Sequence, residues 1–125
     1  MNPNGSTLWF IPDGYLAAPV GPDPNYKNHE AFCVINATDE DAHLLIDIYF
    51  ADRAPAEGIT VTVPAKRCYH IRTDDPQQLG GFQLPFDTPY GARIRANVPV
   101  VVQYSRMYAT TANISLMTTM AHPAE

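Results

Sequence analysis

Apolar and polar residues alternate along several short segments of this chain. The clearest segment covers residues 42–52, where apolar side chains occupy every even position from Ala42 to Phe50. A period of two places successive side chains on opposite faces of a β-strand, so this segment predicts a long strand with one apolar face. Residues 59–63 repeat the pattern and end at Pro64, which has no amide to donate to a neighbouring strand. Further strands are predicted at residues 7–11, 30–37, 66–73, 93–97, 100–108 and 114–120.

The segments between these runs are rich in Pro, Gly, Asp and Asn, which favour turns and loops. The chain has 12 prolines and 7 tyrosines in 125 residues, and few runs of the residues that fill helices. We expect no helix longer than one or two turns. About eight short strands, each apolar on one face, are typical of a two-sheet sandwich or a barrel. We therefore predict a single all-β domain over residues 1–125.

Charge and hydropathy exclude several classes of protein. The net charge is −5, so the chain lacks the basic stripe that favours nucleic-acid binding. The longest apolar runs, residues 8–12 and 98–102, are far shorter than the ~20 residues that span a bilayer. Residues 1–7 have neither the positive cluster nor the apolar segment of a secretory signal. We expect a cytoplasmic protein without membrane insertion.

Motifs for metal binding, cofactor binding or covalent catalysis are absent from the sequence. The four histidines form no His-x-His pair, and Cys33 and Cys68 are too far apart for a Cys-x-x-Cys motif. There is no Gly-x-Ser-x-Gly nucleophile motif and no Gly-rich phosphate loop. We predict no metal and no cofactor.

Several polar side chains interrupt the predicted strands. In residues 66–73, His70 and Arg72 share one face about 7 Å apart, and Arg67 lies on the other face. A guanidinium and an imidazole side by side bind a carboxylate, a phosphate or vicinal hydroxyls. The alternative is a solvated strand face.

Trp9, His29 and Glu30 add the groups that commonly recognise sugars. An indole ring stacks on sugar C–H groups, and a carboxylate accepts hydrogen bonds from hydroxyls. The alternatives are a core tryptophan and a pair of residues that anchor the preceding Pro-rich loop.

The sequence is compatible with two different environments for each of two further segments. Arg93, Arg95 and Asn97 alternate with apolar residues, which fits either a solvent face or contact with an acidic neighbouring subunit. The apolar segment at residues 114–120 is either a last strand or a segment that packs on a neighbour.

The order of many residues resembles that of the sensory rhodopsin transducer family. The matching residues run from about 7 to 120 and include Trp9, Gly14-Tyr15, His29-Glu30, Asn36-Ala37, Asp39 to His43, Ile48-Tyr49, Val63-Pro64-Ala65, Arg67, His70, Arg72, Asn97 to Gln103 and Arg106. The resemblance implies a jelly-roll β-sandwich that forms a cyclic homotetramer in the cytoplasm. It also implies a signalling role beside a photoactive membrane protein or the binding of sugar-like metabolites. Met107 and Tyr108 replace the Leu-Asp pair that follows the arginine in this family.

These observations favour a non-catalytic module that binds a small polar ligand such as a sugar or sugar acid. We expect the ligand-binding side chains to converge on one solvent-accessible hollow: Trp9, His29, Glu30, Arg67, His70, Arg72 and Arg106. One alternative is a transducer that contacts a membrane photoreceptor and binds no small molecule. Another is a carbohydrate-active enzyme with Glu30 as acid or base, which requires Asp47, Asp52 or Asp87 within about 5 to 10 Å.

Overall fold

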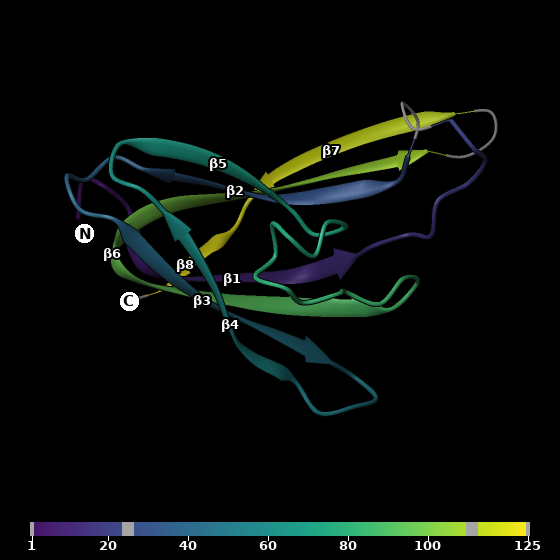
Figure 1. The fold of residues 1–125 in the computed structure, drawn as a ribbon, viewed down its shortest axis with the longest axis horizontal. Coiled ribbons are helices and arrows are strands. Elements are labelled where there is room, and N and C mark those ends of the chain that lie inside the picture. The colour runs from purple at the N-terminus through teal and green to yellow at the C-terminus, as the bar shows by residue number, and fades with distance from the viewer. Residues whose placement is uncertain (1, 24–26, 110–112, 125) are drawn as a thin grey trace.

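The computed structural model describes residues 2–23, 27–109 and 113–124, and these residues form an antiparallel all-β structure (Figure 1). No helix occurs in these ranges, so the predicted all-β fold is confirmed. The strands are β1 (Ser6–Tyr15), β2 (His29–Asn36), β3 (Ala42–Phe50), β4 (Ala56–Val63), β5 (Arg67–Arg72), β6 (Pro89–Ala109), β7 (Ile114–Met120) and β8 (His122–Ala124).

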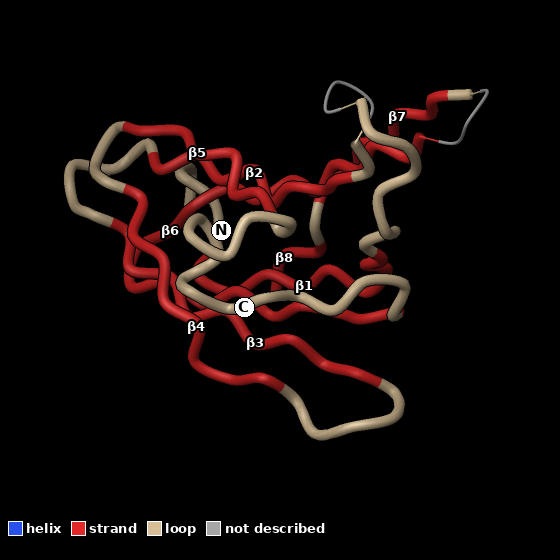
Figure 2. The backbone as a smooth tube through the Cα atoms, turned by 45° about the vertical axis from the view of Figure 1, so that its right-hand side comes forward, coloured by secondary structure: helices blue, strands red, loops and turns tan. Residues whose placement is uncertain are grey.

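Two layers of strands share β6 (Figure 2). The first sheet has the order β4-β3-β6-β1-β8 and uses the N-terminal half of β6. The second sheet has the order β5-β2-β6-β7 and uses the C-terminal half. In Figure 1, β6 curves from the lower layer into the upper one, so a single strand connects the two faces of the sandwich.

The continuity of β6 corrects the prediction of two separate strands at residues 93–97 and 100–108. Residues 97–99 have no strand partner among the described residues, because here β6 leaves β3 and has not yet joined β2. Pro99 therefore removes no ladder hydrogen bond and does not interrupt the strand. The alternation predicts the strand on each side of Pro99 correctly, but it does not predict that the two halves are one continuous strand.

The inner faces of the two sheets enclose one apolar core. Alternate positions of β3 enter it, as the period-two pattern predicted: Ala42, Leu44, Ile46 and Ile48 are all buried. Other large core residues from both sheets include Trp9, Ile11, Phe32, Val34, Ile71, Ile94, Val102 and Tyr104. Among the described residues, no helix is long and apolar enough to cross a membrane.

Candidate functional site

A fully buried carboxylate, that of Glu30, lies between the two sheets. The hydroxyl of Thr73 donates to Oε1 at 2.8 Å, and the backbone amide of Tyr15 donates to Oε2 at 3.2 Å. The Tyr90 hydroxyl also donates to Oε1, and the Tyr104 hydroxyl to Oε2. Each carboxylate oxygen therefore accepts two hydrogen bonds, which offsets the cost of burying the charge.

The two tyrosines reach Glu30 from the two halves of β6. Tyr90 fits because Gly14 faces its ring, and a Cβ atom at residue 14 would overlap that ring. Burial and the negative charge of Glu30 raise the pKa of both tyrosine hydroxyls. Both hydroxyls therefore stay protonated at neutral pH and remain donors to Glu30.

Arg106 extends the Glu30 cluster to the surface. Its Nε donates to the Tyr104 hydroxyl at 3.0 Å, and its Nη2 donates to the backbone carbonyl of Asp13 at 2.8 Å. Tyr104 thus links the only guanidinium of this cluster to the buried carboxylate, within the described residues. Glu30 on β2 and Arg106 on β6 are also paired in the register of these two strands.

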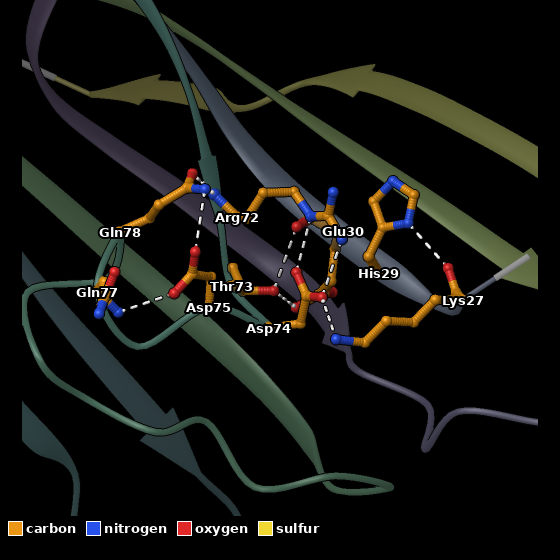
Figure 3. A network of polar contacts seen from close by, with 9 residues as sticks. All are labelled: Lys27, His29, Glu30, Arg72, Thr73, Asp74, Asp75, Gln77 and Gln78. Atoms are coloured by element: carbon orange, nitrogen blue, oxygen red, sulfur yellow. Dashed lines mark hydrogen bonds and ion pairs between the residues drawn. The ribbon is translucent and has the colours of Figure 1, made fainter. Parts of the chain in front are cut away.

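A second polar network joins the start of β2 to the turn after β5 (Figure 3). Arg72 donates to both carboxylate oxygens of Asp74, at 2.7 and 2.9 Å, and Lys27 Nζ lies 3.0 Å from Oδ2 of the same residue. Burial of Asp74 by itself raises its pKa, but Arg72 and Lys27 outweigh that effect and hold the pKa below its usual value. His29 donates from Nδ1 to the Lys27 carbonyl at 2.9 Å. This network anchors the loop that precedes β2.

A groove of about 600 Å³ lies between β4 and β5, the edge strands of the two sheets. His70, Tyr69, Thr60 and Thr62 line it, together with the Gln77 side chain. Within the described part of the chain, neither the His70 imidazole nor the Tyr69 hydroxyl has a hydrogen-bond partner. These groups are therefore available to a molecule in the groove.

The turn at residues 74–81 closes one end of this groove. Gln78 fixes the turn: its Oε1 accepts from the Arg72 amide at 3.0 Å, and its Nε2 donates to Asp75 at 3.2 Å. Gly80 has a φ of 59°, and it passes so close to the β4 backbone that a Cβ atom would collide with the Thr60 carbonyl. A glycine is therefore required where the turn contacts β4.

The structure does not bring the seven predicted ligand-binding side chains into one hollow. Trp9 is buried in the core, and its Nε1 donates to the carbonyls of Ser6 and Val100 at 2.9 and 3.0 Å. Glu30 is buried as well, with its oxygens occupied by protein donors. The expectation of a single solvent-accessible hollow is therefore wrong, because these two polar groups point into the sandwich.

The other five side chains are divided among four places. His70 lines the groove, and Arg72 is paired with Asp74. Arg67 is exposed at the start of β5, where its guanidinium donates to the Lys66 carbonyl at 3.1 Å. His29 and Arg106 line a separate hollow of about 330 Å³ on the second sheet. Of these residues, Glu30 and Arg106 are linked through Tyr104, His29 and Arg106 line the same hollow, and His29 and Arg72 belong to the network around Asp74.

A cluster that sequence reasoning missed surrounds Asp47 on the outer face of the first sheet. Arg93 donates to Asp47 Oδ2 from Nε and Nη2, at 3.0 and 2.8 Å, and Arg95 donates to the same oxygen at 3.1 Å. The Gly58 amide donates to Oδ1 at 2.8 Å. Burial alone raises the pKa of Asp47, but these donors lower it overall. The sequence does contain a signal for this cluster, because Asp47 is a charged residue within an apolar strand. Arg93 and Arg95 contact this acidic residue of the same chain, whereas the sequence left open an acidic neighbouring subunit.

The carboxylates considered as partners of Glu30 in an enzyme are engaged elsewhere. Asp47 binds the two arginines, Asp52 pairs with Arg53 at 2.9 Å, and Asp87 accepts from the Ala18 amide at 3.0 Å. Among the described residues, no group of three or more His, Cys, Asp or Glu side chains has the arrangement of a metal site.

Comparison with known proteins gives one consistent result. The family model described as Anabaena sensory rhodopsin transducer matches residues 4–123. The structure named "Crystal Structure of Thermotoga maritima 1070" superimposes with a TM-score of 0.85 and 34% identity, covering 98% of this chain and 97% of that one. The structure named "Anabaena sensory rhodopsin transducer" superimposes with a TM-score of 0.71 and 42% identity, covering 80% of this chain and 86% of that one. No curated protein matches the chain.

Proposed function

This chain belongs to the Anabaena sensory rhodopsin transducer family, and from that premise we propose that it is a non-catalytic signalling module that binds a small polyhydroxylated ligand. The ligand is a sugar or sugar acid, and it occupies the groove between β4 and β5. The module forms a homotetramer in the cytoplasm and passes the occupancy of the groove to a receptor partner.

The observation that carries this proposal is the set of unpaired polar groups in the groove. An imidazole, a phenol, a threonine hydroxyl and a side-chain amide line a space of about 600 Å³, which is within the usual range for a small-molecule site. These groups donate and accept hydrogen bonds, as adjacent sugar hydroxyls require, and the Tyr69 ring offers an apolar surface.

In this proposal the seven predicted residues have different roles. His70 contacts the ligand directly. Arg72 acts indirectly, because its backbone amide holds Gln78 and thereby the turn that closes the groove. Trp9 and Glu30 hold the sandwich together, and Arg106 orients Tyr104 above Glu30.

A thermal-shift screen of neutral sugars and sugar acids tests the proposal. A ligand at about ten times its Kd stabilises a protein by about 1.4 kcal/mol, which raises the Tm of a chain of this size by about 5 °C. We expect His70→Ala to abolish that shift without changing the Tm of the free protein by more than about 1 °C. His122→Ala, an exposed histidine on β8, is the matched control and keeps the shift.

The second candidate function is a transducer that contacts a membrane photoreceptor without a small-molecule ligand. It is favoured by the 42% identity to the structure named as the sensory rhodopsin transducer. This function predicts no thermal shift with any compound of the screen and a direct interaction with a membrane receptor in a pull-down. If a sugar stabilises the wild type but not His70→Ala, this second candidate function is contradicted.

A further inference from the structure

A hollow that the proposed function does not use lies on the outer face of the first sheet, over β4, β3 and the N-terminal half of β6. Its volume is about 470 Å³, which is within the usual range for a small-molecule site. Among its described lining residues, Arg95 is the only one with a fixed charge. Leu45, which is 38% exposed, is the register partner of Arg95 and lies beside it. The hollow therefore combines one positive charge with an apolar surface.

The positive charge of Arg95 is only partly balanced. Arg95 donates to Asp47 from Nη2 alone, at 3.1 Å, and within the described residues its Nε and Nη1 have no acceptor. Arg93 donates twice to the same carboxylate oxygen. The hydrogen bond to Asp47 raises the pKa of Arg93, and the negative charge of Glu57 raises it further. Two carboxylates therefore act on Arg93, whereas Arg95 shares one carboxylate and keeps free donors that face the hollow.

His43 adds a second polar group to this hollow, on the same face of β3 as Leu45. The side-chain oxygen of Asn97 accepts from the His43 backbone amide at 2.6 Å, and His43 Nδ1 lies 3.1 Å from the Thr62 hydroxyl. When Nδ1 accepts from that hydroxyl, Nε2 carries the proton. In the part of the chain that the structure describes, Nε2 has no partner, so it can donate to an anion beside Arg95.

We propose that this hollow binds a small carboxylic acid with an apolar body. The carboxylate accepts from the free donors of Arg95 and from His43, and the apolar body packs on Leu45. Hydrogen bonds from a guanidinium to a carboxylate are among the strong ones, so an uncharged ligand loses most of the binding. A bare inorganic anion makes no use of Leu45. The site is independent of the proposed function, because His70, which contacts the ligand in the groove, does not line this hollow.

A heteronuclear NMR titration of the full chain tests this site, with benzoate as the probe. Benzoate shifts the amide resonances of residues 43–45 and 95–97, whereas benzamide and inorganic phosphate at the same concentration give at most about a tenth of that shift. Arg95→Met keeps the length of the side chain without its charge, and it raises the Kd for benzoate at least about tenfold. Arg53→Met is the matched control, because it removes the same charge from an exposed arginine in the turn between β3 and β4, and it leaves that Kd unchanged.

A second variant leaves the contact between Arg95 and Asp47 intact. Leu45→Asp places a carboxylate of the protein beside Arg95, where it competes with benzoate and abolishes the shifts. Leu45→Asn has the same shape without the charge, and it weakens benzoate binding less than Leu45→Asp does. Circular dichroism confirms that the variants keep the β-fold.

Three results overturn the inference. They are the absence of benzoate shifts at residues 43–45 and 95–97 in the wild type, equal shifts with benzamide or phosphate, and an unchanged Kd in both Arg95→Met and Leu45→Asp. His70→Ala keeps the wild-type Kd for benzoate, so a failure at this hollow is distinguished from a failure at the groove.

Discussion

Glu30 and Asp47 are two carboxylates with the same burial and opposite surroundings. Neutral donors surround Glu30: hydroxyls of tyrosine and threonine and one backbone amide. Two guanidinium groups and one amide surround Asp47. Glu30 lies between the sheets, where an arginine is reached only through Tyr104, whereas Asp47 lies on an outer face beside half-exposed arginines.

This difference separates what the two residues connect. The donors to Glu30 come from β1, from both halves of β6 and from the turn after β5, so the carboxylate joins the two sheets. The donors to Asp47 come from β4 and β6, the two strands that flank β3 in one sheet. Loss of Glu30 is therefore expected to weaken contact between the two sheets, whereas loss of Asp47 weakens contact between adjacent strands of one sheet.

The largest expected effect is that of Glu30→Ala. It leaves buried hydroxyl donors without an acceptor, and each unsatisfied group costs about 1 to 3 kcal/mol, so we expect a loss of about 4 kcal/mol in the free energy of unfolding. Urea denaturation measures this loss. Glu30→Gln keeps the shape and one acceptor and loses about half as much; an equal loss in both variants would show that the charge, rather than the acceptor geometry, stabilises the sandwich.

Asp47→Asn has a smaller expected effect, of about 2 kcal/mol, because the partly exposed guanidinium groups regain water when the carboxylate is neutralised. The same urea experiment measures it, with Asp52→Asn as the control for an exposed aspartate paired with an arginine. A loss as large as that of Glu30→Ala would contradict the distinction between the two sites.

Acid titration has the smallest expected effect, and it sharpens the comparison. The folded pKa values of Asp47 and Asp74 are lowered, so their stabilisation is present above the unfolded pKa of about 3.9 and is lost as the pH falls below it. We expect the stability difference between the wild type and Asp74→Asn to be constant from about pH 7 to 5 and to shrink toward pH 3. Urea midpoints at these pH values measure it, and a constant difference down to pH 3 would contradict the lowered pKa.

Hydrophobic alternation predicted most strands to within a few residues because each strand buries one face. It failed at Pro99, since only the partners of β6 reveal that residues 97–99 need no ladder hydrogen bonds. Alternation also did not predict the surroundings of Trp9 and Glu30. The sequence pattern of a strand is the same whether its polar group contacts a ligand or a hydrogen-bonding group of another strand. The contacts of Glu30 come from residues 15 to 74 positions away, and no local pattern reports them.

The passage of β6 through both sheets has a mechanical consequence. Residues 97–99 are the point at which one continuous backbone changes partners, so sliding of one layer over the other must bend the chain there. The backbone of β6 therefore runs directly from β3 and β1, the partners of its N-terminal half, to β2 and β7, the partners of its C-terminal half.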